Sequence, residues 1–599
     1  MKNLKLTSAL LSSAAMIVAA VALTSNGSVA AEKATAVNPN NLTTKYPIKH
    51  LVVVFNENRS FDHYFGTYPN ALNVEGEPRF EPAAATPTII NNLLSSPALL
   101  DTNNPNDNPN VVPSNGQTPT QPTNGANAAF PFRIDRTQAN TAGQNHAYTP
   151  EQNAYDNGKN DLFPFDVGNG TTGGAGFFGT KGQVMGFFDG NTVTAYWNYA
   201  QNFAMSDNAW GDTFGPSTPG LLNMFAGNTN GIVPTNNGGS ATSGNALPDG
   251  QGGFSLIGDI DPTMDICSPA TQPGGKGTTV ASTATNIGDL LNAGTTANPV
   301  IPWGSFVGGF NLQAINENGS VGCSGINSQG KPATNAGRSS ISAVTAETIN
   351  DYVQHHIWFQ YFTSTANPTH LRPTSTAAIG YTEVPGTKKV DPANHAYDLE
   401  DFATAVASGN FPAVSFIKMA AFQDEHPGNS NSLDAQTGFV NLVNFLMQQP
   451  DWDSTAVILN YDDSDGWYDH AFATPTHTSF SASDTLTSPG ACGVVGTTEP
   501  TGVKGLPVHG RCGPGTRLPF LVISPFAKKN YVSHVFITQA SIPQFIEDNW
   551  LNGERLGDGS FDATTGSIVD MFDFTQKKSV TLFLDPTTGL IEETKKIKN

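Results

Sequence analysis

Short apolar runs constrain the fold of this 599-residue chain more than any other feature of its sequence. Each run is four or five residues long, is bounded by turn or helix signals and has the length of a buried strand. Between two of them, apolar residues recur at helical spacing over residues 439–446. Strands that alternate with helices predict an α/β domain with a mostly parallel central sheet. The runs are Leu51–Phe55, Ala413–Ile417, Ala456–Leu459 and Phe520–Ile523.

Two long segments between these runs have the composition of surface insertions. Residues around 69–130 include low-complexity stretches of Asn, Pro and Thr, and residues around 228–345 begin with a part rich in Gly, Asn and Thr. Long loops of this kind often wall or cover a binding site. We therefore predict a single domain over residues 45–590 with two loop-rich insertions.

The N-terminus has the pattern of a secretory signal peptide. Lys2 and Lys5 precede an apolar, Ala-rich run over residues 9–23, and small residues follow at 28–31. A membrane anchor would need about 20 unbroken apolar residues, and serines interrupt this run. We predict that residues 1–31 are removed, and that the mature chain is periplasmic or secreted and has no transmembrane anchor.

The four cysteines all follow this segment. An even number of cysteines in an oxidising compartment predicts two disulfides. A thiolate metal site would instead favour close pairs such as C-x-x-C, which the sequence lacks. Our interpretation pairs nearest neighbours: Cys267 with Cys323, and Cys492 with Cys512.

The charge of the chain excludes one class of partner. The sequence has 29 Lys and Arg residues against 50 Asp and Glu residues, a formal net charge of −21. Proteins that bind nucleic acid need cationic side chains to neutralise phosphates and release counterions. We therefore expect no nucleic-acid binding.

Polar clusters follow two of the predicted strands directly. The segment 56–62 comes after the first run and the segment 460–466 after the third, and both are rich in carboxylate and amide groups. Ligands of open α/β sheets bind beyond the carboxyl ends of the strands, where such oxygens can converge on one divalent cation. Asp, Asn and Gly also end strands because they favour turns. Two such clusters together favour the metal interpretation.

A third segment offers a nucleophile. In Gly215–Phe225, Pro219 suits the first turn of a helix, so that Ser217 or Thr218 would be the N-cap or lie just before it. A hydroxyl at that place faces unpaired backbone N–H groups, which also attract a phosphoryl anion. Helix capping alone is the alternative role.

Three histidines lie among polar, loop-like residues: His146, His356 and His426. An imidazole can donate to phosphate oxygens or pass a proton to a leaving group. A surface or structural role is the alternative for each of them. His63, His470 and His534 follow apolar stretches and are lesser candidates.

Four motifs occur in a fixed order along the chain. They are residues 48–67, which include Glu57-Asn-Arg-Ser-Phe-Asp-His-Tyr-Phe-Gly-Thr67, followed by residues 215–219, 424–428 and 460–470. With them the chain resembles the bacterial phosphoesterase family of acid phosphatases and non-haemolytic phospholipases C, and it looks closest to the acid phosphatase branch. The resemblance covers about residues 45–555. It implies an alkaline-phosphatase-like α/β sandwich, with helices on both faces of the sheet and a metal ion at the strand ends.

The resemblance also implies roles for single residues. Ser217 is similar to the family's nucleophile, although other members have Thr there in a Gly-Pro-Thr-Asn-Pro motif. Carboxylate, amide and hydroxyl ligands suit several divalent ions, so the metal's identity stays open. The metal ligands implied are Glu57, Asn58, Ser217, Asp462 and Asp463. The histidines implied to contact the phosphate or the leaving group are His146, His356 and His426.

The expected function is hydrolysis of phosphate monoesters through a phosphoserine, as in an acid phosphatase acting on a small phosphorylated substrate. A phospholipase C acting on phospholipids is the main alternative. Such enzymes usually add C-terminal β-rich modules, whereas this chain ends soon after its last match, and residues 356–368 look more like the acid phosphatase branch. A sulfatase would need Arg where Leu221 stands. A secreted binding protein without catalysis is a more remote alternative.

Overall fold

A computed structural model describes most of the chain after residue 36. The predicted signal peptide, residues 1–31, lies outside the described residues, as does much of the first predicted insertion. The described residues are 37–102, 129–171, 178–238, 244–271, 275–312, 323, 339–494, 501–502, 504–576 and 580–596.

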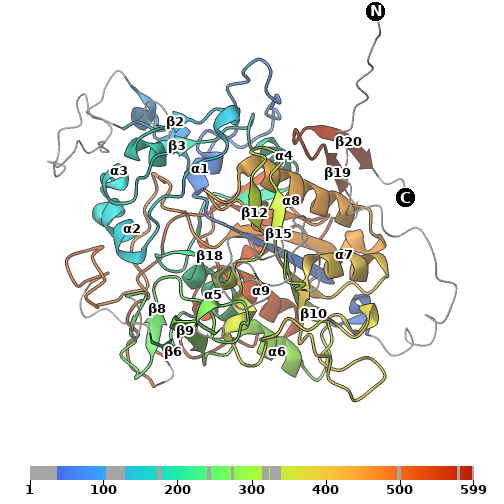
Figure 1. Cartoon of the computed structure of the whole chain (residues 1–599). Coiled ribbons are helices and arrows are strands. Elements are labelled where there is room, and N and C mark those ends of the chain that lie inside the picture. The colour runs from blue at the N-terminus through green and yellow to red at the C-terminus, as the bar shows by residue number, and fades with distance from the viewer. Residues whose placement is uncertain are drawn as a thin grey trace, which may run out of the picture.

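An eight-stranded sheet forms the centre of the molecule (Figure 1). Five neighbouring strands, from β13 to β15, are parallel, β16 is antiparallel to both of its neighbours, and β4 and β17 are again parallel to each other. This confirms the α/β fold with a mostly parallel sheet. In spatial order the strands are β13 (Ala396–Asp398), β10 (Trp303–Val307), β14 (Val414–Lys418), β1 (His50–Asn56), β15 (Thr455–Tyr461), β16 (Phe520–Ile523), β4 (Ala204–Ser206) and β17 (Tyr531–Ser533).

The four apolar runs found in the sequence become β1, β14, β15 and β16. Every residue of these strands is buried, as expected for a sheet that is covered on both faces. β1 lies between β14 and β15, and its last residue, Asn56, pairs with Tyr461 at the end of β15. The residues that follow, Glu57 and Asp462, therefore leave the sheet side by side.

Helices cover both faces of the sheet. Figure 1 shows α4 and α8 on one side of it and α5, α6 and α9 on the other. The helical spacing over residues 439–446 lies within α8. The helices are α1 (Phe61–Phe65), α2 (Tyr148–Tyr155), α3 (Phe163–Asp166), α4 (Thr194–Asn202), α5 (Ser217–Ala226), α6 (Ile287–Ala293), α7 (Leu399–Ala407), α8 (Ser432–Met447) and α9 (Ser541–Trp550).

Helix α5 packs closely against the sheet, and its sequence explains the fit. Its ten residues are all buried, and the ring of Phe225 meets that of Phe416 on β14 edge-on, with 5.5 Å between centroids. A Cβ atom at Gly220 would lie 1.9 Å from the backbone oxygen of Asp462. Only glycine permits this approach, which brings the first turn of α5 to the end of β15.

The smaller sheets lie around this core. The second predicted insertion, around 228–345, contains a four-stranded sheet, but it also contains β10, a strand of the central sheet. The sequence of β10, Trp-Gly-Ser-Phe-Val, lacks the continuous aliphatic run that identified the other strands. The small-sheet strands are β7 (Ala246–Pro248), β8 (Phe254–Leu256), β6 (Ile232–Asn237) and β9 (Gly277–Ser282), with the pairs β2 (Phe132–Arg133) and β3 (Gly186–Phe187), β5 (Ala209–Trp210) and β18 (Ile537–Thr538), β11 (Ser339–Ile341) and β12 (Thr348–Asn350), and β19 (Val580–Leu584) and β20 (Ile591–Lys596).

Two disulfides join the cysteines as nearest neighbours. Cys267 is bonded to Cys323 and Cys492 to Cys512, which confirms the predicted pairing. Among the residues that the structure describes, no helix combines the length and the apolar character needed to cross a membrane.

Candidate active site

The carboxyl ends of β1 and β15 bring an oxygen cluster together. Glu57 and Asn58 follow β1, Asp462 and Asp463 follow β15, and all four side chains are buried. The backbone ties these strand ends to each other, because Asp462 N–H donates to the Asn56 carbonyl at 3.1 Å. We call Glu57, Asn58, Ser217, Asp462 and Asp463 the site cluster.

The side-chain amide of Asn58 lies between two carboxyl groups. One end of the amide is 2.6 Å from Glu57 Oε2 and 3.0 Å from Asp462 Oδ1. With its nitrogen at that end, Asn58 donates a hydrogen bond to both carboxyl groups, and its oxygen is then the end that a cation would contact.

Ser217 points into the same cluster. Its hydroxyl donates to Glu57 Oε2 at 3.0 Å and to Asp463 Oδ2 at 3.2 Å. Ser217 is the first residue of α5 and Pro216 is the N-cap. The helix therefore begins earlier than it would with Ser217 or Thr218 as the N-cap. The next hydroxyl, that of Thr218, is bonded to Asp259 at 2.9 Å and to the His355 carbonyl at 3.1 Å. Of the two hydroxyls, that of Ser217 meets the carboxylates of the cluster.

The three predicted histidines lie beside the site cluster. His356 Nδ1 is 3.0 Å from Glu57 Oε1, and His146 Nδ1 is 3.2 Å from Asp465 Oδ1. The ring of His426 stacks on that of His356 at 5.6 Å between centroids and meets that of His146 edge-on at 6.2 Å. The structure therefore brings all eight predicted site residues into one place, from six separate parts of the chain.

The environment divides these histidines by charge. Although burial opposes it, Asp463 and Asp465 raise the pKa of His146 well above its usual value. Burial lowers the pKa of His356 and of His426. The site thus offers one cationic imidazole and two neutral ones at neutral pH.

The acids of the cluster divide in a similar way. Burial, Glu57 and Asp463 raise the pKa of Asp462 well above its usual value, and burial also raises that of Asp463 despite the nearby His146. Burial would raise the pKa of Glu57 too, but the Lys418 ammonium holds it below its usual value. The site cluster therefore contains more buried carboxylate than its cations balance.

Several groups at the site were not among the predicted site residues, although Asp424 lies in the motif of residues 424–428. Lys418, the last residue of β14, bonds to Glu57 Oε1, and its ammonium lies 4.0 Å from Asp462 Oδ2. Asp424 lies 3.9 Å from His356 Nδ1. Lys418 directly follows the apolar run Ala413–Ile417. Inspection of the residue after every predicted strand would have found it.

Glu151 connects the turn before Ser217 to the segment that follows β15. Its Oε2 accepts from Gly215 N–H at 2.9 Å and its Oε1 from the Ser464 hydroxyl at 2.7 Å. Gly215 has a φ of 114°, a conformation that glycine adopts without strain. Burial raises the pKa of Glu151 to about 7. One buried carboxyl thereby fixes two turns that carry predicted site residues.

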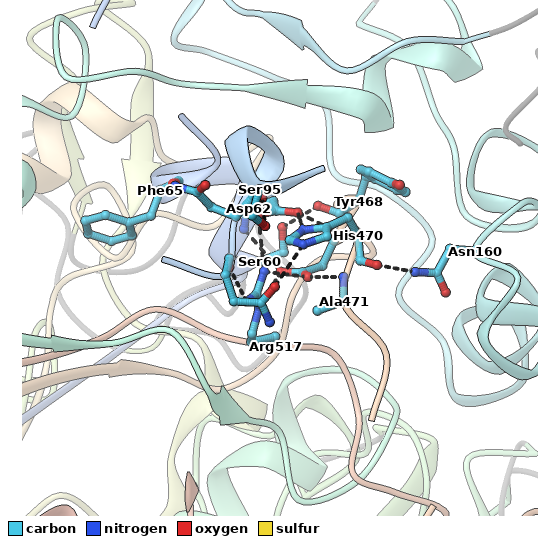
Figure 2. Close-up of polar contacts among 12 residues, drawn as sticks. Ser60, Asp62, Phe65, Ser95, Asn160, Tyr468, His470, Ala471 and Arg517 are labelled. Atoms are coloured by element: carbon cyan, nitrogen blue, oxygen red, sulfur yellow. Dashed lines mark hydrogen bonds and ion pairs between the residues drawn. The ribbon is translucent and has the colours of Figure 1, made fainter. Parts of the chain in front are cut away.

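A second polar cluster links the segment after β1 to the segment after β15. Arg517 makes two bonds to Asp469, of 2.9 and 3.1 Å, and a third to Asp62 at 3.2 Å. His470 Nδ1 lies 2.6 Å from Asp62 Oδ2, and Figure 2 shows both His470 and Arg517 directed toward Asp62. We call Asp62, Asp469, His470 and Arg517 the brace cluster. The lesser candidate His470 thus belongs to a charge-balanced network.

The site cluster fits a divalent cation. It combines carboxylate, amide and hydroxyl oxygens, which are the ligands of hard cations. Asp462 Oδ2 is buried and has no hydrogen-bond partner. Among the described residues, Glu57, His356 and His426 have ligand atoms close enough to hold an ion, and so do Asp62, Asp469 and His470 of the brace cluster. In the brace cluster Arg517 already bonds to both aspartates, so the uncompensated Asp462 oxygen is what favours a bound cation at the site cluster.

Several bacterial phospholipases C are similar to this chain in sequence. Phospholipase C B from Mycobacterium tuberculosis is 24% identical over 556 residues, covering 90% of this chain and 79% of that protein. The hemolytic phospholipase C of Pseudomonas aeruginosa is 22% identical over 548 residues, covering 90% of this chain and 58% of that protein. A non-hemolytic phospholipase C from Burkholderia pseudomallei is 30% identical over 143 residues, or 24% of this chain and 19% of that protein.

A solved alkaline phosphatase mutant aligns with 63% of this chain and 94% of its own at 11% identity. The TM-score is 0.28, too low for any conclusion. The family profile is more informative, since residues 48–551 match that of the Phosphoesterase family. This span includes the site cluster, the three histidines and the brace cluster. The chain therefore belongs to the Phosphoesterase family and is a hydrolase that acts on phosphoric ester bonds.

Proposed function

We propose that this chain is an exported, metal-dependent phosphatase that hydrolyses phosphate monoesters through Ser217 and a phosphoserine intermediate. The observation that carries the proposal is the position of the Ser217 hydroxyl, which donates to Glu57 and Asp463 at 3.0 and 3.2 Å. Both carboxyl groups therefore hold the Ser217 proton. Either of them can receive that proton.

The ligands proposed for the divalent ion are Glu57, Asn58, Ser217, Asp462 and Asp463. When bound, the ion supplies Lewis-acid charge that lowers the pKa of the serine hydroxyl and stabilises a phosphoryl oxygen. Ser217 lies at the N-terminus of α5, whose positive partial charge favours a phosphoryl anion. The buried chain around the cluster excludes water, which strengthens these interactions.

The histidines take roles that follow from their charge. His146, held cationic by Asp463 and Asp465, can stabilise the equatorial oxygens or protonate the leaving alkoxide. His426 is neutral because burial lowers its pKa, so it can accept a proton from the water that hydrolyses the phosphoserine. His356, 3.0 Å from Glu57, orients that carboxylate.

Positive charge near Ser217 supports a monoester substrate. Asp261 and Asp259 raise the pKa of His355 to about 9 despite burial, and His355 packs edge-on against His356 at 4.5 Å. With His146 and Lys418, three cationic groups lie near the nucleophile. A phosphate monoester carries up to two negative charges at its phosphoryl group and a diester one, so this charge favours the monoester.

A phospholipase C is the second candidate. The observation that favours it is the set of relatives, since the two that match 90% of this chain are both named phospholipases C. Such an enzyme would use the same nucleophile and cation on a phosphodiester. Export of either enzyme is supported by the two disulfides, which persist in oxidising compartments.

A paired assay separates these possibilities. The mature wild-type chain, Ser217→Ala and the matched control Thr218→Ala are compared on p-nitrophenyl phosphate and on p-nitrophenyl phosphorylcholine, with and without a chelator. We expect the monoester to be the better substrate, with turnover lost in Ser217→Ala and in chelator but largely kept in Thr218→Ala. Better turnover of the choline diester would favour phospholipase C, and full activity of Ser217→Ala would refute the serine mechanism.

A further inference from the structure

The two oxygens of Glu57 face different surroundings. Oε2 lies 2.6 Å from the Asn58 amide and accepts from Ser217 Oγ at 3.0 Å, inside the site cluster. Oε1 faces the other way, toward the Lys418 ammonium and toward His356 Nδ1 at 3.0 Å. Glu57 therefore separates two groups of polar atoms.

The group on the Oε1 side has the composition of a cation site. Glu57, His356 and His426 each offer one ligand atom there, and these atoms lie within 4.8 Å of one another. Asp424 Oδ2 is 3.9 Å from His356 Nδ1. Asp462 contributes its second oxygen, Oδ2, which is buried without a hydrogen-bond partner. Carboxylates and neutral imidazoles in this number suit a divalent transition-metal ion.

Lys418 reaches this group from the end of β14. Its ammonium bonds to Glu57 and lies 4.0 Å from Asp462 Oδ2. Only a small cavity, about 10 Å³ in volume, remains beside it, lined in part by His356 and Asp424. Such a space admits one water molecule, and a hydrated ion would not fit.

We propose that the Lys418 ammonium stands in the place of a second divalent ion, so that the centre holds one metal ion per chain and shortening Lys418 opens it to two. The inference rests on the metal ion of the proposed function. In two-metal hydrolases the ions lie about 3.5–4 Å apart, a spacing that a bridging carboxylate can span. Glu57, with one oxygen toward each group, has the orientation of such a bridge, and Lys418 occupies one end of it.

The test measures metal binding apart from turnover. Metal-free full-length mature chain is titrated with Mn²⁺ alone, with bound ion counted by equilibrium dialysis and the spin state followed by electron paramagnetic resonance. We expect one Mn²⁺ per wild-type chain with the spectrum of an isolated ion. Lys418→Ala should bind two, with the spectrum of an exchange-coupled pair.

Two further variants define the site of the second ion. Lys418→Ala combined with Asp424→Asn should return to one ion, because a ligand of the second group is lost. Lys528→Ala serves as the matched control: Lys528 is half-exposed and paired with Asp570 at 3.4 Å, away from the site cluster, and this variant should bind one ion like the wild type.

Each outcome decides the inference. Two ions in the wild-type chain would overturn it whether or not Lys418→Ala folds, and so would a folded Lys418→Ala that binds one. If Lys418→Ala does not fold, Lys418→Ser recovered in the presence of Mn²⁺ gives the second stoichiometry. A wild-type chain that binds no ion would instead refute the metal dependence in the proposed function, a result distinct from the failure of the role of Lys418.

Discussion

Two buried clusters formed by the same pair of chain segments differ in how their charge is balanced. The site cluster and the brace cluster both draw on the residues after β1 and after β15, and both bury carboxylates almost completely. In the brace cluster, Arg517 and His470 contact the two aspartates at 2.6–3.2 Å. In the site cluster, Glu57, Asp462 and Asp463 are buried together, and one carboxylate oxygen of Asp462 has no hydrogen-bond partner.

This difference separates a structural role for the brace cluster from a chemical role for the site cluster. A buried carboxylate is costly unless a cation and hydrogen bonds compensate it. The brace cluster supplies its own cation, so its acids serve to hold the two loops in register. The site cluster leaves negative charge for a bound ion to compensate, and that charge is what the proposed catalysis uses.

The largest contrast is expected for matched Asp→Asn substitutions. Asp463→Asn removes a proposed metal ligand and should lower kcat/KM at least about 1,000-fold, since the charge of a metal ion contributes several kcal/mol to catalysis. The metal-free fold should be no less stable, because burial and the nearby Glu151 and Glu57 disfavour the Asp463 carboxylate more than His146 favours it. Steady-state kinetics and urea unfolding in chelator measure both effects. Activity close to wild type in Asp463→Asn would remove this residue from the site.

The brace cluster should respond in the opposite way. Asp469→Asn leaves Arg517 buried without its bidentate partner, so the free energy of unfolding should fall by about 3–5 kcal/mol. Urea unfolding measures the loss. Glu383→Gln is the control, because it breaks the exposed pair with Lys388 and should cost at most about 1 kcal/mol. Equal losses in the two variants would mean that burial does not distinguish the pairs.

Metal ions should stabilise one cluster only. A divalent ion that binds the folded chain at about 100 times its Kd adds about 2.7 kcal/mol to the free energy of unfolding. We expect this gain in the wild type and in Asp469→Asn, and its loss in Asp463→Asn. Thermal unfolding with and without added Mn²⁺ checks it. A gain that persists in Asp463→Asn would place the ion elsewhere.

The smallest expected effect is on the stability of the fold at acid pH. Burial raises the pKa of Asp62, but His470 and Arg517 outweigh it and hold that pKa below the usual 3.8. A carboxyl with a lowered pKa stabilises the fold above its unfolded-state pKa, and this contribution is lost as the pH falls below about 3.8. The stability advantage of wild type over Asp62→Asn should therefore shrink below pH 4, by at most about 1.4 kcal/mol per pH unit. Urea unfolding between pH 3 and 6 would contradict this if the difference stayed constant.

The strands were predictable where their sequences are continuous and aliphatic. β1, β14, β15 and β16 are fully buried in the sheet and have no polar face. β10 was missed because its Gly and Ser interrupt the pattern, and its place in the sheet depends on pairing with β14 and β13, segments about 90 to 110 residues away. Local pattern carries no information about such a pairing.

The candidate site was predictable where motifs end strands. Glu57, Asn58, Asp462 and Asp463 follow apolar runs, and the structure gathers them with Ser217 and the three histidines. Lys418 and Glu151 were missed for different reasons. Lys418 is a single charge at the end of a strand, and Glu151 lies within a helix whose sequence is otherwise ordinary. Their contacts with Glu57 and Gly215 exist only in the folded chain.

Trapping the phosphoenzyme tests the central claim most directly. The mature chain, saturated with metal, is mixed with p-nitrophenyl phosphate at low temperature and quenched in acid, and its peptides are analysed by mass spectrometry. We predict one added phosphoryl group on the peptide that contains Ser217, located at Ser217, and no adduct in Ser217→Ala. A phosphoryl group on Thr218 or on a histidine, or turnover without any adduct in either protein, would contradict the serine mechanism.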